Sequence, residues 1–261
     1  MVHDSLAMKN WALITGGSAG IGYELAKLFA ADRFNLVLVA RNEARLKHVA
    51  EEFHSKHGTE VKILARDLSV VAAPMQIFEE LRDTPVSVLV NNAGFGWHGA
   101  FVEGDLQRSL DMMHVNMDAL VALTHLFAQP MLARRDGRIL NVASTAAFQP
   151  GPTAAIYFAT KVFVYSFSCA LAEELAGTGV TVTALCPGST RTEFHERARM
   201  QRFSRKIPMM EARTVAEIGY RGLMRGKRVV IPGSVNKMTA ALGKGLPERV
   251  TSRVVRRLYT D

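Results

Sequence analysis

The sequence has little cysteine and no long hydrophobic run, and each of these absences narrows what the protein can be. Only Cys169 and Cys186 are present among its 261 residues. One falls in an expected helix and the other at the end of an expected strand, so we interpret both as reduced core thiols of a reducing compartment. No stretch reaches 18 consecutive apolar residues, and the N-terminus MVHDSLAMKN lacks a hydrophobic segment. We therefore expect neither a membrane-spanning helix nor a signal peptide.

The sequence also lacks the spacings of a metal site and any recognisable nucleic-acid-binding module. No cluster of His, Cys and carboxylate residues has metal-ligand spacing, so no metal is expected, and His98 is interpreted as a solvated loop residue. The formal charge is +8, but residues 227–261 alone hold eight Lys or Arg against two acidic residues. We expect a soluble, cytoplasmic protein that does not bind nucleic acid.

Short apolar runs alternate with helical periodicity along most of the chain. The expected strands are 11–15, 35–40, 60–65, 86–90, 138–142, 180–185 and 228–231, and the expected helices are 21–31, 43–57, 72–82, 105–128, 154–176 and 214–224. Apolar strands separated by helices indicate a parallel sheet covered on both faces. We expect one doubly wound α/β domain over residues 1–261, with a substrate loop at 189–212 and a basic extension at 234–261.

One stretch concentrates proton chemistry. Tyr157 and Lys161 are four residues apart in an expected helix and so share a face. An ammonium group beside the phenol favours the phenolate and would lower the pKa of Tyr157 from its usual ~10. Ser144 follows an apolar strand, at the edge where open α/β sheets place ligands. The alternative is an ordinary half-buried tyrosine beside a solvated lysine.

A glycine-rich turn lies between the first strand and the first helix. It reads Thr15-Gly-Gly-Ser-Ala-Gly-Ile-Gly22, and its candidate phosphate-binding residues are Gly16, Ser18, Gly20, Ile21 and Gly22. Glycines let the backbone approach a pyrophosphate, and the helix N-terminus offers free N–H groups. Taken alone, the turn could also be purely structural.

With these motifs the chain resembles the short-chain dehydrogenase/reductase family from Lys9 to about Thr192. The matching parts occur in the family's order: the glycine turn, Asp67-Leu68, Asn91-Asn-Ala-Gly94, Asn116, Ser144, Tyr157 with Lys161, and Pro187-Gly188. The resemblance implies a Rossmann fold and an NAD(P)-dependent oxidoreductase that interconverts a carbonyl and an alcohol. It makes Tyr157 and Lys161 candidate catalytic residues.

The resemblance also assigns roles. Tyr157 would exchange a proton with the substrate oxygen, while Lys161 would hold the nicotinamide ribose and lower the pKa of that tyrosine. Ser144 would hydrogen-bond the carbonyl group. Asn116 would anchor a water on a proton path, or would be a buried polar group that kinks its helix. The remaining implied cofactor contacts are Asp67 and Leu68 near the adenine, the segment Asn92, Ala93 and Gly94, and Pro187, Gly188 and Thr190 or Thr192 at the carboxamide.

The end of the second strand predicts a preference for NADP(H) over NAD(H). An NAD enzyme usually has an acidic residue there for the ribose 2′-hydroxyl, whereas this chain has Ala40-Arg41. A guanidinium group matches a 2′-phosphate in charge and geometry, and Ser18 could add a donor. The usual second basic residue of the turn is missing, since Ala19 takes its place. Arg41 could alternatively just end the strand.

Apolar residues around the expected mouth predict a hydrophobic substrate, such as a lipid-like, steroid-like or acyl carbonyl compound or alcohol. They are Phe95, Trp97, Phe148, Pro150, Phe194, Phe203, Met209 and Met210, although each could equally belong to the core. Four arginines nearby could attract an acidic end group: Arg197, Arg199, Arg202 and Arg205. A dinucleotide-sensing regulatory protein on the same fold is the alternative function, since a fold alone does not exclude it.

Two further expectations concern surfaces. The helix at 154–176 is apolar on more than one side, which indicates a homodimer or homotetramer. Residues 248–260 would form an amphipathic helix with Val250, Val254, Val255, Leu258 and Tyr259 on one side and Arg249, Arg253, Arg256 and Arg257 on the other. Such a helix could touch the inner face of an anionic membrane, or it could pack on the protein's own substrate loop or on a partner subunit.

Overall fold

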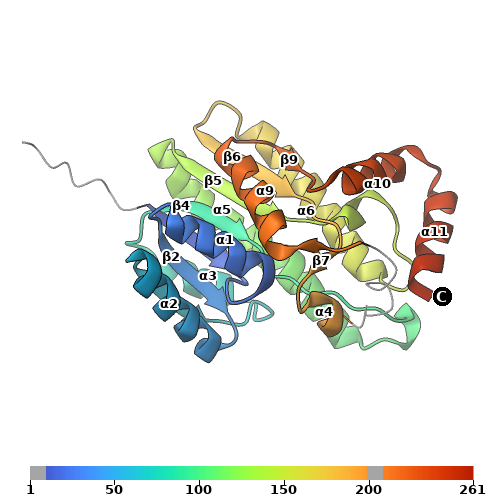
Figure 1. Cartoon of the computed structure of the whole chain (residues 1–261), viewed down its shortest axis with the longest axis horizontal. Coiled ribbons are helices and arrows are strands. Elements are labelled where there is room, and N and C mark those ends of the chain that lie inside the picture. The colour runs from blue at the N-terminus through green and yellow to red at the C-terminus, as the bar shows by residue number, and fades with distance from the viewer. Residues whose placement is uncertain (1–9, 199–207, 261) are drawn as a thin grey trace, which may run out of the picture.

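Seven parallel strands form one sheet at the centre of the computed structural model, which describes residues 10–198 and 208–260 (Figure 1). The strand order is β3-β2-β1-β4-β5-β6-β9. The strands are β1 Trp11–Thr15, β2 Asn35–Ala40, β3 Val61–Ala65, β4 Val86–Asn91, β5 Gly137–Val142, β6 Val180–Leu185 and β9 Val229–Val230. The order reverses between β1 and β4, which is the point where doubly wound sheets bind ligands. The expected doubly wound α/β fold is confirmed.

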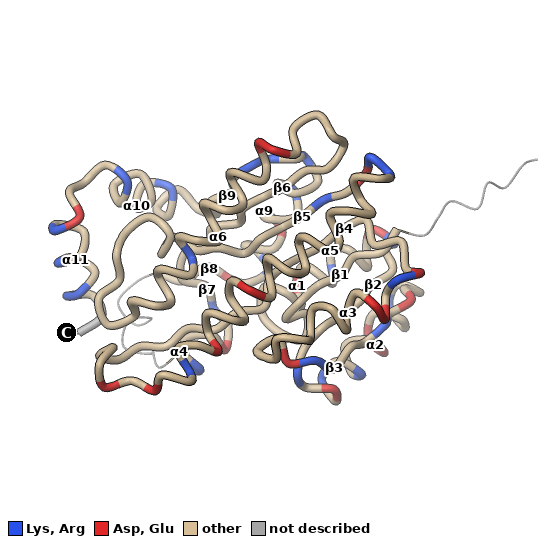
Figure 2. The backbone as a smooth tube through the Cα atoms, turned by 180° about the vertical axis from the view of Figure 1, so that it is seen from behind, with Lys and Arg blue, Asp and Glu red and all other residues tan. Residues whose placement is uncertain are grey.

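Helices cover both faces of this sheet (Figures 1 and 2). One face carries α1 Gly20–Ala31, α2 Glu43–His57 and α9 Ala212–Met224, and the other carries α3 Ala73–Glu80, α5 Ala119–Arg134 and α6 Ala155–Glu174. Side chains alternate along each strand, so Trp11 and Leu13 pack on the second group while Ala12 and Ile14 pack on the first. Burial on both faces explains why the strands are almost entirely apolar.

The helix expected at 105–128 ends later than predicted and is interrupted. The structure has α4 Leu106–Met113, a π-helical turn over His114–Asp118 (η2), and then α5, which continues through Pro130 to Arg134. Proline breaks a helix locally because it lacks an N–H group. Here Phe127 and Met131 are buried against the sheet on both sides of that proline, so tertiary packing holds the last turn in place.

The chain after Pro187 contains more regular structure than the sequence predicts. A small sheet pairs β7 Thr190–Arg191 with β8 Met210–Glu211, and the short α7 Phe194–Arg197 follows β7. The helix α10 Ser234–Gly245 was not expected, because it is rich in small residues and buries only Ala240. Two short 3-10 helices, Phe101–Glu103 (η1) and Thr145–Phe148 (η3), were also missed.

The expected C-terminal helix is present as α11 Glu248–Thr260, at the same end of the molecule as α10 (Figure 1). Its apolar stripe is divided. Val255 is buried and Leu258 is partly buried against a cluster around Tyr157 and Ala198, whereas Val250 and Val254 are 44% and 53% exposed. The side chain of Tyr259 lies outside the described residues. Part of the stripe thus packs on the protein itself, and the membrane contact stays a prediction.

Both cysteines are free thiols, with Cys186 buried and Cys169 half-buried. Among the described helices, α6 is long and apolar enough to cross a membrane by length and composition. Core helices of globular proteins often pass the same test, and α6 packs against the sheet through buried residues such as Val164 and Ser168. The helix is therefore only weak evidence for a membrane span.

Candidate active site

A large cavity opens along the carboxyl ends of the strands, with a volume of about 1400 Å³. It exceeds the ~300–1,000 Å³ of ordinary ligand pockets, so it has room for a dinucleotide together with a substrate. Of the cofactor residues expected from the sequence, all but Gly22 line this cavity. They are Gly16, Ser18, Gly20, Ile21, Arg41, Asp67, Leu68, Asn92, Ala93, Gly94, Tyr157, Lys161, Pro187, Gly188, Thr190 and Thr192. The structure thus brings together residues that are far apart in sequence.

The glycine turn has the backbone of an anion site. Gly16 has a φ of 67°, which favours glycine, and a Cβ atom on Gly22 would overlap the carbonyl oxygen of Gly16 and the side chain of Asn92. Gly22 is therefore required for close packing beneath the turn, and it does not line the cavity. Ala19 precedes α1 without a side-chain cap, which leaves N–H groups of the first turn available to a phosphate. These features fit a dinucleotide pyrophosphate.

Thr15 and Asn92 fix the ends of the two central strands against each other. The Thr15 hydroxyl oxygen accepts hydrogen bonds from the backbone N–H groups of Asn92 and Ala93, both at 3.0 Å. The amide nitrogen of Asn92 donates to the carbonyl oxygens of Thr15, at 2.9 Å, and Gly16, at 3.2 Å. The segment that follows β4 is thereby held beside the glycine turn.

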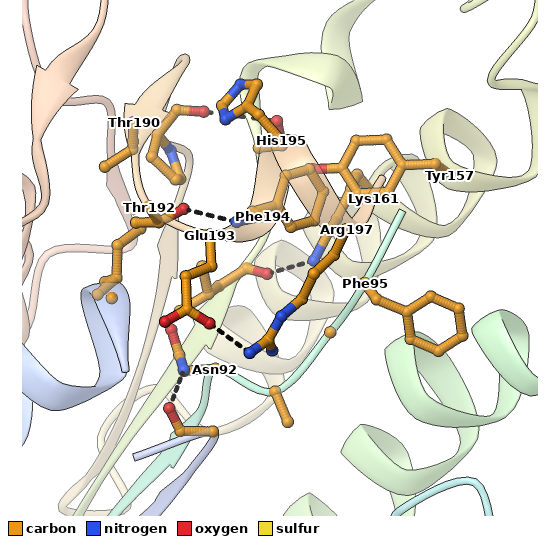
Figure 3. Close-up of a pocket in the computed structure, with 18 of the residues that line it drawn as sticks. Asn92, Phe95, Tyr157, Lys161, Thr190, Thr192, Glu193, Phe194, His195 and Arg197 are labelled. Carbon is orange, nitrogen blue, oxygen red and sulfur yellow. Dashed lines mark hydrogen bonds and ion pairs between the residues drawn. The ribbon is translucent and has the colours of Figure 1, made fainter. Parts of the chain in front are cut away.

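Tyr157, Lys161 and Ser144 meet at the inner end of the cavity (Figure 3 labels the first two). Lys161 lies one turn after Tyr157 on α6, and its Nζ donates a hydrogen bond of 2.9 Å to the carbonyl oxygen of Val142 at the end of β5. Ser144 lies close enough to Tyr157 for its side chain to affect the pKa of the phenol. Its Oγ donates a hydrogen bond of 3.4 Å to the carbonyl oxygen of Pro187 and accepts one of 3.1 Å from the Ala146 N–H. The three groups are assembled as expected, while their individual roles stay predictions.

Burial dominates the protonation of this group. It raises the pKa of Tyr157 to about 12, although the side chain of Ser144 acts in the opposite direction. Burial also lowers the pKa of Lys161 to about 8. The expected lowering of the Tyr157 pKa by Lys161 is not found, because the loss of solvent around the buried phenol is the largest effect and raises that pKa. Tyr157 is thus a protonated phenol at neutral pH and can donate a proton.

Asn116 is buried in the π-helical turn η2 and does not line the cavity. Its Nδ2 donates to the carbonyl oxygen of Phe95 at 3.0 Å and to the Thr160 hydroxyl at 3.1 Å, and its Oδ1 accepts from the Phe95 N–H at 3.0 Å. These bonds join the segment after β4 to α6, which supports the reading of Asn116 as a buried polar group in an irregular helix. Its part in a proton path stays a prediction.

The expected substrate mouth is only partly correct. Phe95, Phe194 and Arg197 line the cavity. Phe148 and Pro150 instead line a second cavity of about 520 Å³ between η3 and the elbow that joins α10 to α11. Trp97 packs under the guanidinium group of Arg108, and Met209 and Met210 do not line the main cavity. The others of the set, Arg199, Arg202, Phe203 and Arg205, lie outside the described residues.

The interpretation of His98 as a solvated residue is wrong. Its Nε2 lies 2.9 Å from the Thr153 hydroxyl, so it joins the loop after β4 to the loop before α6. Partial burial lowers its pKa. The two residues are 55 positions apart in sequence, so no local pattern could predict this contact.

Several lining residues were missed. Val235 and Thr239 of α10 and Val255 and Leu258 of α11 add an apolar wall, although the sequence alone placed that tail beyond the site. The amphipathic stripe of α11 was the available signal, and the alternative in which it packs on the substrate loop is supported, since Val255 and Leu258 cluster with Phe194 and Ala198. Two more missed residues line the cavity: Arg45, in the first turn of α2, and Glu193. Across the described residues, no three His, Cys, Asp or Glu side chains are grouped as a metal would require.

Comparison with known proteins identifies the class. The short chain dehydrogenase family model matches residues 10–202, and the chain belongs to this family. The parallel sheet and the cavity at its carboxyl edge agree with membership of this dehydrogenase family. This result favours the enzyme over the dinucleotide sensor.

Two named relatives are similar to much of the chain. The 17-beta-hydroxysteroid dehydrogenase type 3 of Mus musculus is 36% identical over 191 residues, which cover 71% of this chain and 62% of the relative. A very-long-chain 3-oxoacyl-CoA reductase of Laccaria bicolor is 34% identical over 206 residues, or 77% of this chain and 60% of the relative. The similarity thus spans less than two thirds of the length of these relatives.

Solved structures agree over most of the chain. A short-chain dehydrogenase from Sphingobium yanoikuyae in complex with NADPH superposes with a TM-score of 0.82 at 31% identity, covering 91% of this chain and 96% of that one. A bulky-bulky ketone specific alcohol dehydrogenase from Comamonas testosteroni has a TM-score of 0.77 at 29% identity, with coverage of 91% and 95%.

The buried ammonium group of Lys161 predicts a pH-dependent stability. Its pKa falls from 10.5 to about 8 on folding, so the charged lysine destabilises the fold below about pH 8, and this penalty fades between pH 8 and 10.5. Lys161→Met abolishes this titration. The free energy of unfolding of the variant minus that of the wild type should therefore fall by about 3 kcal/mol between pH 7 and 10.5.

Urea unfolding of both proteins at several pH values measures this difference. The variant lacks the hydrogen bond to Val142 at every pH, so this loss adds only a constant to the difference in the free energy of unfolding. Lys47→Met, at an exposed lysine paired with Glu43, is the matched control and should not show the decrease. A Lys161→Met difference that stays constant over this range would contradict the lowered pKa of the buried Lys161.

Proposed function

We propose that this enzyme interconverts a hydrophobic carbonyl compound and its alcohol with NADP(H), with Tyr157 as the proton donor and acceptor. The observation that carries the proposal is the buried Tyr157 phenol, which lies close to Ser144 and is followed one helical turn later by Lys161. A protonated phenol in a water-poor site is suited to donating a proton to a carbonyl oxygen as that oxygen gains negative charge.

In reduction, the Ser144 hydroxyl donates a hydrogen bond to the substrate oxygen and sets its position beside the Tyr157 phenol. A bound nicotinamide dinucleotide supplies the hydride, or takes it up in the reverse direction. Tyr157 gives its proton to the same oxygen, and the ammonium group of Lys161 stabilises the phenolate that remains. The Lys161 side chain, which lines the cavity beside Gly94, would hold the ribose hydroxyls.

The substrate side of the cavity supports an apolar substrate. Phe95 and Phe194 line the same cavity as Val255 and Leu258. Arg197 also lines it, and its guanidinium group, which pairs with Glu193, adds positive charge near the substrate space. The named relatives act, by their names, on a hydroxysteroid and on a very-long-chain 3-oxoacyl-CoA. Steroid-like and acyl carbonyl compounds are therefore the first classes to test.

The cofactor preference rests on charge at the end of β2. Arg41 and Ser18 line the cavity there, and no acidic residue follows β2 directly. Arg41 is exposed, and its nearest acidic partner, Asp67, lies 3.9 Å away, so its guanidinium group is available to a 2′-phosphate.

A homo-oligomer is favoured by the outer side of α6. Val162 and Phe163 are 43% and 40% exposed on this helix, and the Phe163 ring stacks on Phe167. Large apolar side chains on the helix that carries the candidate catalytic residues would be covered by a second copy of the chain.

The proton role of Tyr157 is tested by Tyr157→Phe. A screen of carbonyl compounds and alcohols by cofactor absorbance first finds a substrate. Turnover on it should then fall by about 10²- to 10⁴-fold while the dissociation constant of the cofactor stays nearly unchanged, because only the transferable proton is removed. Tyr165→Phe is the control, since that hydroxyl group lies on the same helix and contacts Lys244 outside the cavity. Retained turnover in Tyr157→Phe would refute the assignment.

The cofactor preference is tested by calorimetry of NADP(H) and NAD(H) binding. The wild type should bind NADP(H) more tightly, and Arg41→Ala should weaken NADP(H) binding by about tenfold or more with little change for NAD(H). Tighter binding of NAD(H) by the wild type would sink the proposal.

The oligomer is tested by light scattering at micromolar concentration. The wild type should have the mass of a dimer or tetramer, and Phe163→Asp should lower it because a charge would be buried in the contact. A monomeric mass for the wild type would rule out the contact.

A further inference from the structure

A short segment bridges the cofactor cavity. We call residues Thr190–Arg197, which comprise β7 and α7, the strap. A Cβ atom on Gly20 would lie only 3.0 Å from Cγ2 of Thr192, so the strap rests against the glycine turn. Thr190, Thr192, Glu193 and Arg197 of the strap all line the cavity (Figure 3).

The strap is joined to the opposite wall by one ion pair. Arg45 of α2 presents both terminal nitrogens to Glu193, with Nη1 at 3.1 Å from Oε2 and Nη2 at 3.0 Å from Oε1. The same carboxylate also pairs with Arg197 within the strap. The two residues are 148 positions apart in sequence, so this fork links the adenosine side of the cavity to the substrate loop.

Arg45 could replace a basic residue that the glycine turn lacks. It lines the cavity together with Arg41, while the turn position that often carries a basic residue is Ala19. The other arginine of this wall, Arg66, is paired with Glu80 of α3 at 2.8 Å. A 2′-phosphate bound at Arg41 would therefore have a second guanidinium group in Arg45, which lies in the first turn of α2 and lines the same cavity.

We propose that Arg45 is a second 2′-phosphate-binding residue and that it exchanges Glu193 for the phosphate when a 2′-phosphorylated cofactor binds. The proposal rests on the proposed NADP(H) preference. It adds that Glu193 of the strap competes with the 2′-phosphate for Arg45. A cofactor with a free 2′-hydroxyl leaves the Arg45 and Glu193 pair intact.

The exchange is favourable because the existing pair is weak. The side chains of Arg45 and Glu193 are 46% and 43% exposed, and water screens such pairs strongly. A phosphate carries more charge than a carboxylate and accepts the same forked hydrogen bonds. Glu193 is not left unpaired by the exchange, since Arg197 remains beside it.

The experiment compares two adenosine ligands that differ in the 2′-phosphate, adenosine 2′,5′-bisphosphate and 5′-AMP, by calorimetry with the full chain. Arg45→Ala should weaken the bisphosphate by about tenfold and leave 5′-AMP nearly unchanged. Glu193→Gln should tighten the bisphosphate by roughly two- to fivefold, because the competitor is removed. In the double variant, Glu193→Gln should have no further effect. Lys47→Ala is the matched control, as it removes one positive charge from the same helix outside the cavity.

Any of the following outcomes would overturn this inference. If Arg45→Ala weakens both ligands equally, Arg45 only supports the fold of the strap and the proposal is overturned. It is also overturned if Glu193→Gln acts equally with and without Arg45. If the wild type prefers the bisphosphate and loses that preference in Arg41→Ala but not in Arg45→Ala, this inference fails while the proposed cofactor preference stands. If the wild type binds both ligands equally, the cofactor preference itself falls, and the exchange with it.

Discussion

The geometry of the site depends on one buried hydrogen bond, from Nζ of Lys161 to the carbonyl oxygen of Val142. Taking an ammonium group out of water is unfavourable, and the carbonyl group at the end of β5 compensates for part of that loss. Because α6 is tied to the strand end at this point, Tyr157, one turn earlier, is set beside Ser144. Lower on the same helix, Ser168 accepts a hydrogen bond from Asn141 of β5 at 2.9 Å. Two polar contacts thus fix the rotation of α6 on an otherwise apolar face.

The parallel sheet turns these local contacts into a site. All of its strands end at one edge, so the groups that follow β1, β4, β5 and β6 converge without being close in sequence. The buried amide of Asn91 bonds Asn141 across β4 and β5 at 2.9 Å and holds this edge in register. The ends of the hydrogen-bonded strands form one wall of the cavity. The strap forms the opposite wall and is held in part by exposed ion pairs, which open more easily than the sheet.

What the sequence could predict follows from how local each signal is. The strands of the seven-stranded sheet, the glycine turn and the placement of Tyr157 and Lys161 on one helix rest on neighbouring residues and were predicted correctly. The continuation of α5 past Pro130 depends on burial of Met131 in the sheet, which local propensity does not contain. The direction of the Tyr157 pKa shift depends on how completely the fold excludes water. The contacts of Val255 and of Arg45 join distant segments, so their positions in the site had no local signal.

The wall contributed by α10 and α11 ties the shape of the cavity to the end of the chain. The family model ends at residue 202, whereas Val235, Thr239, Val255 and Leu258 come later and line the same cavity. Val255 and Leu258 of α11 pack in one cluster with Tyr157 and Ala198. A change in the length or side-chain volume of α11 would therefore reshape the space beside Tyr157 without altering a residue of the glycine turn or of α6.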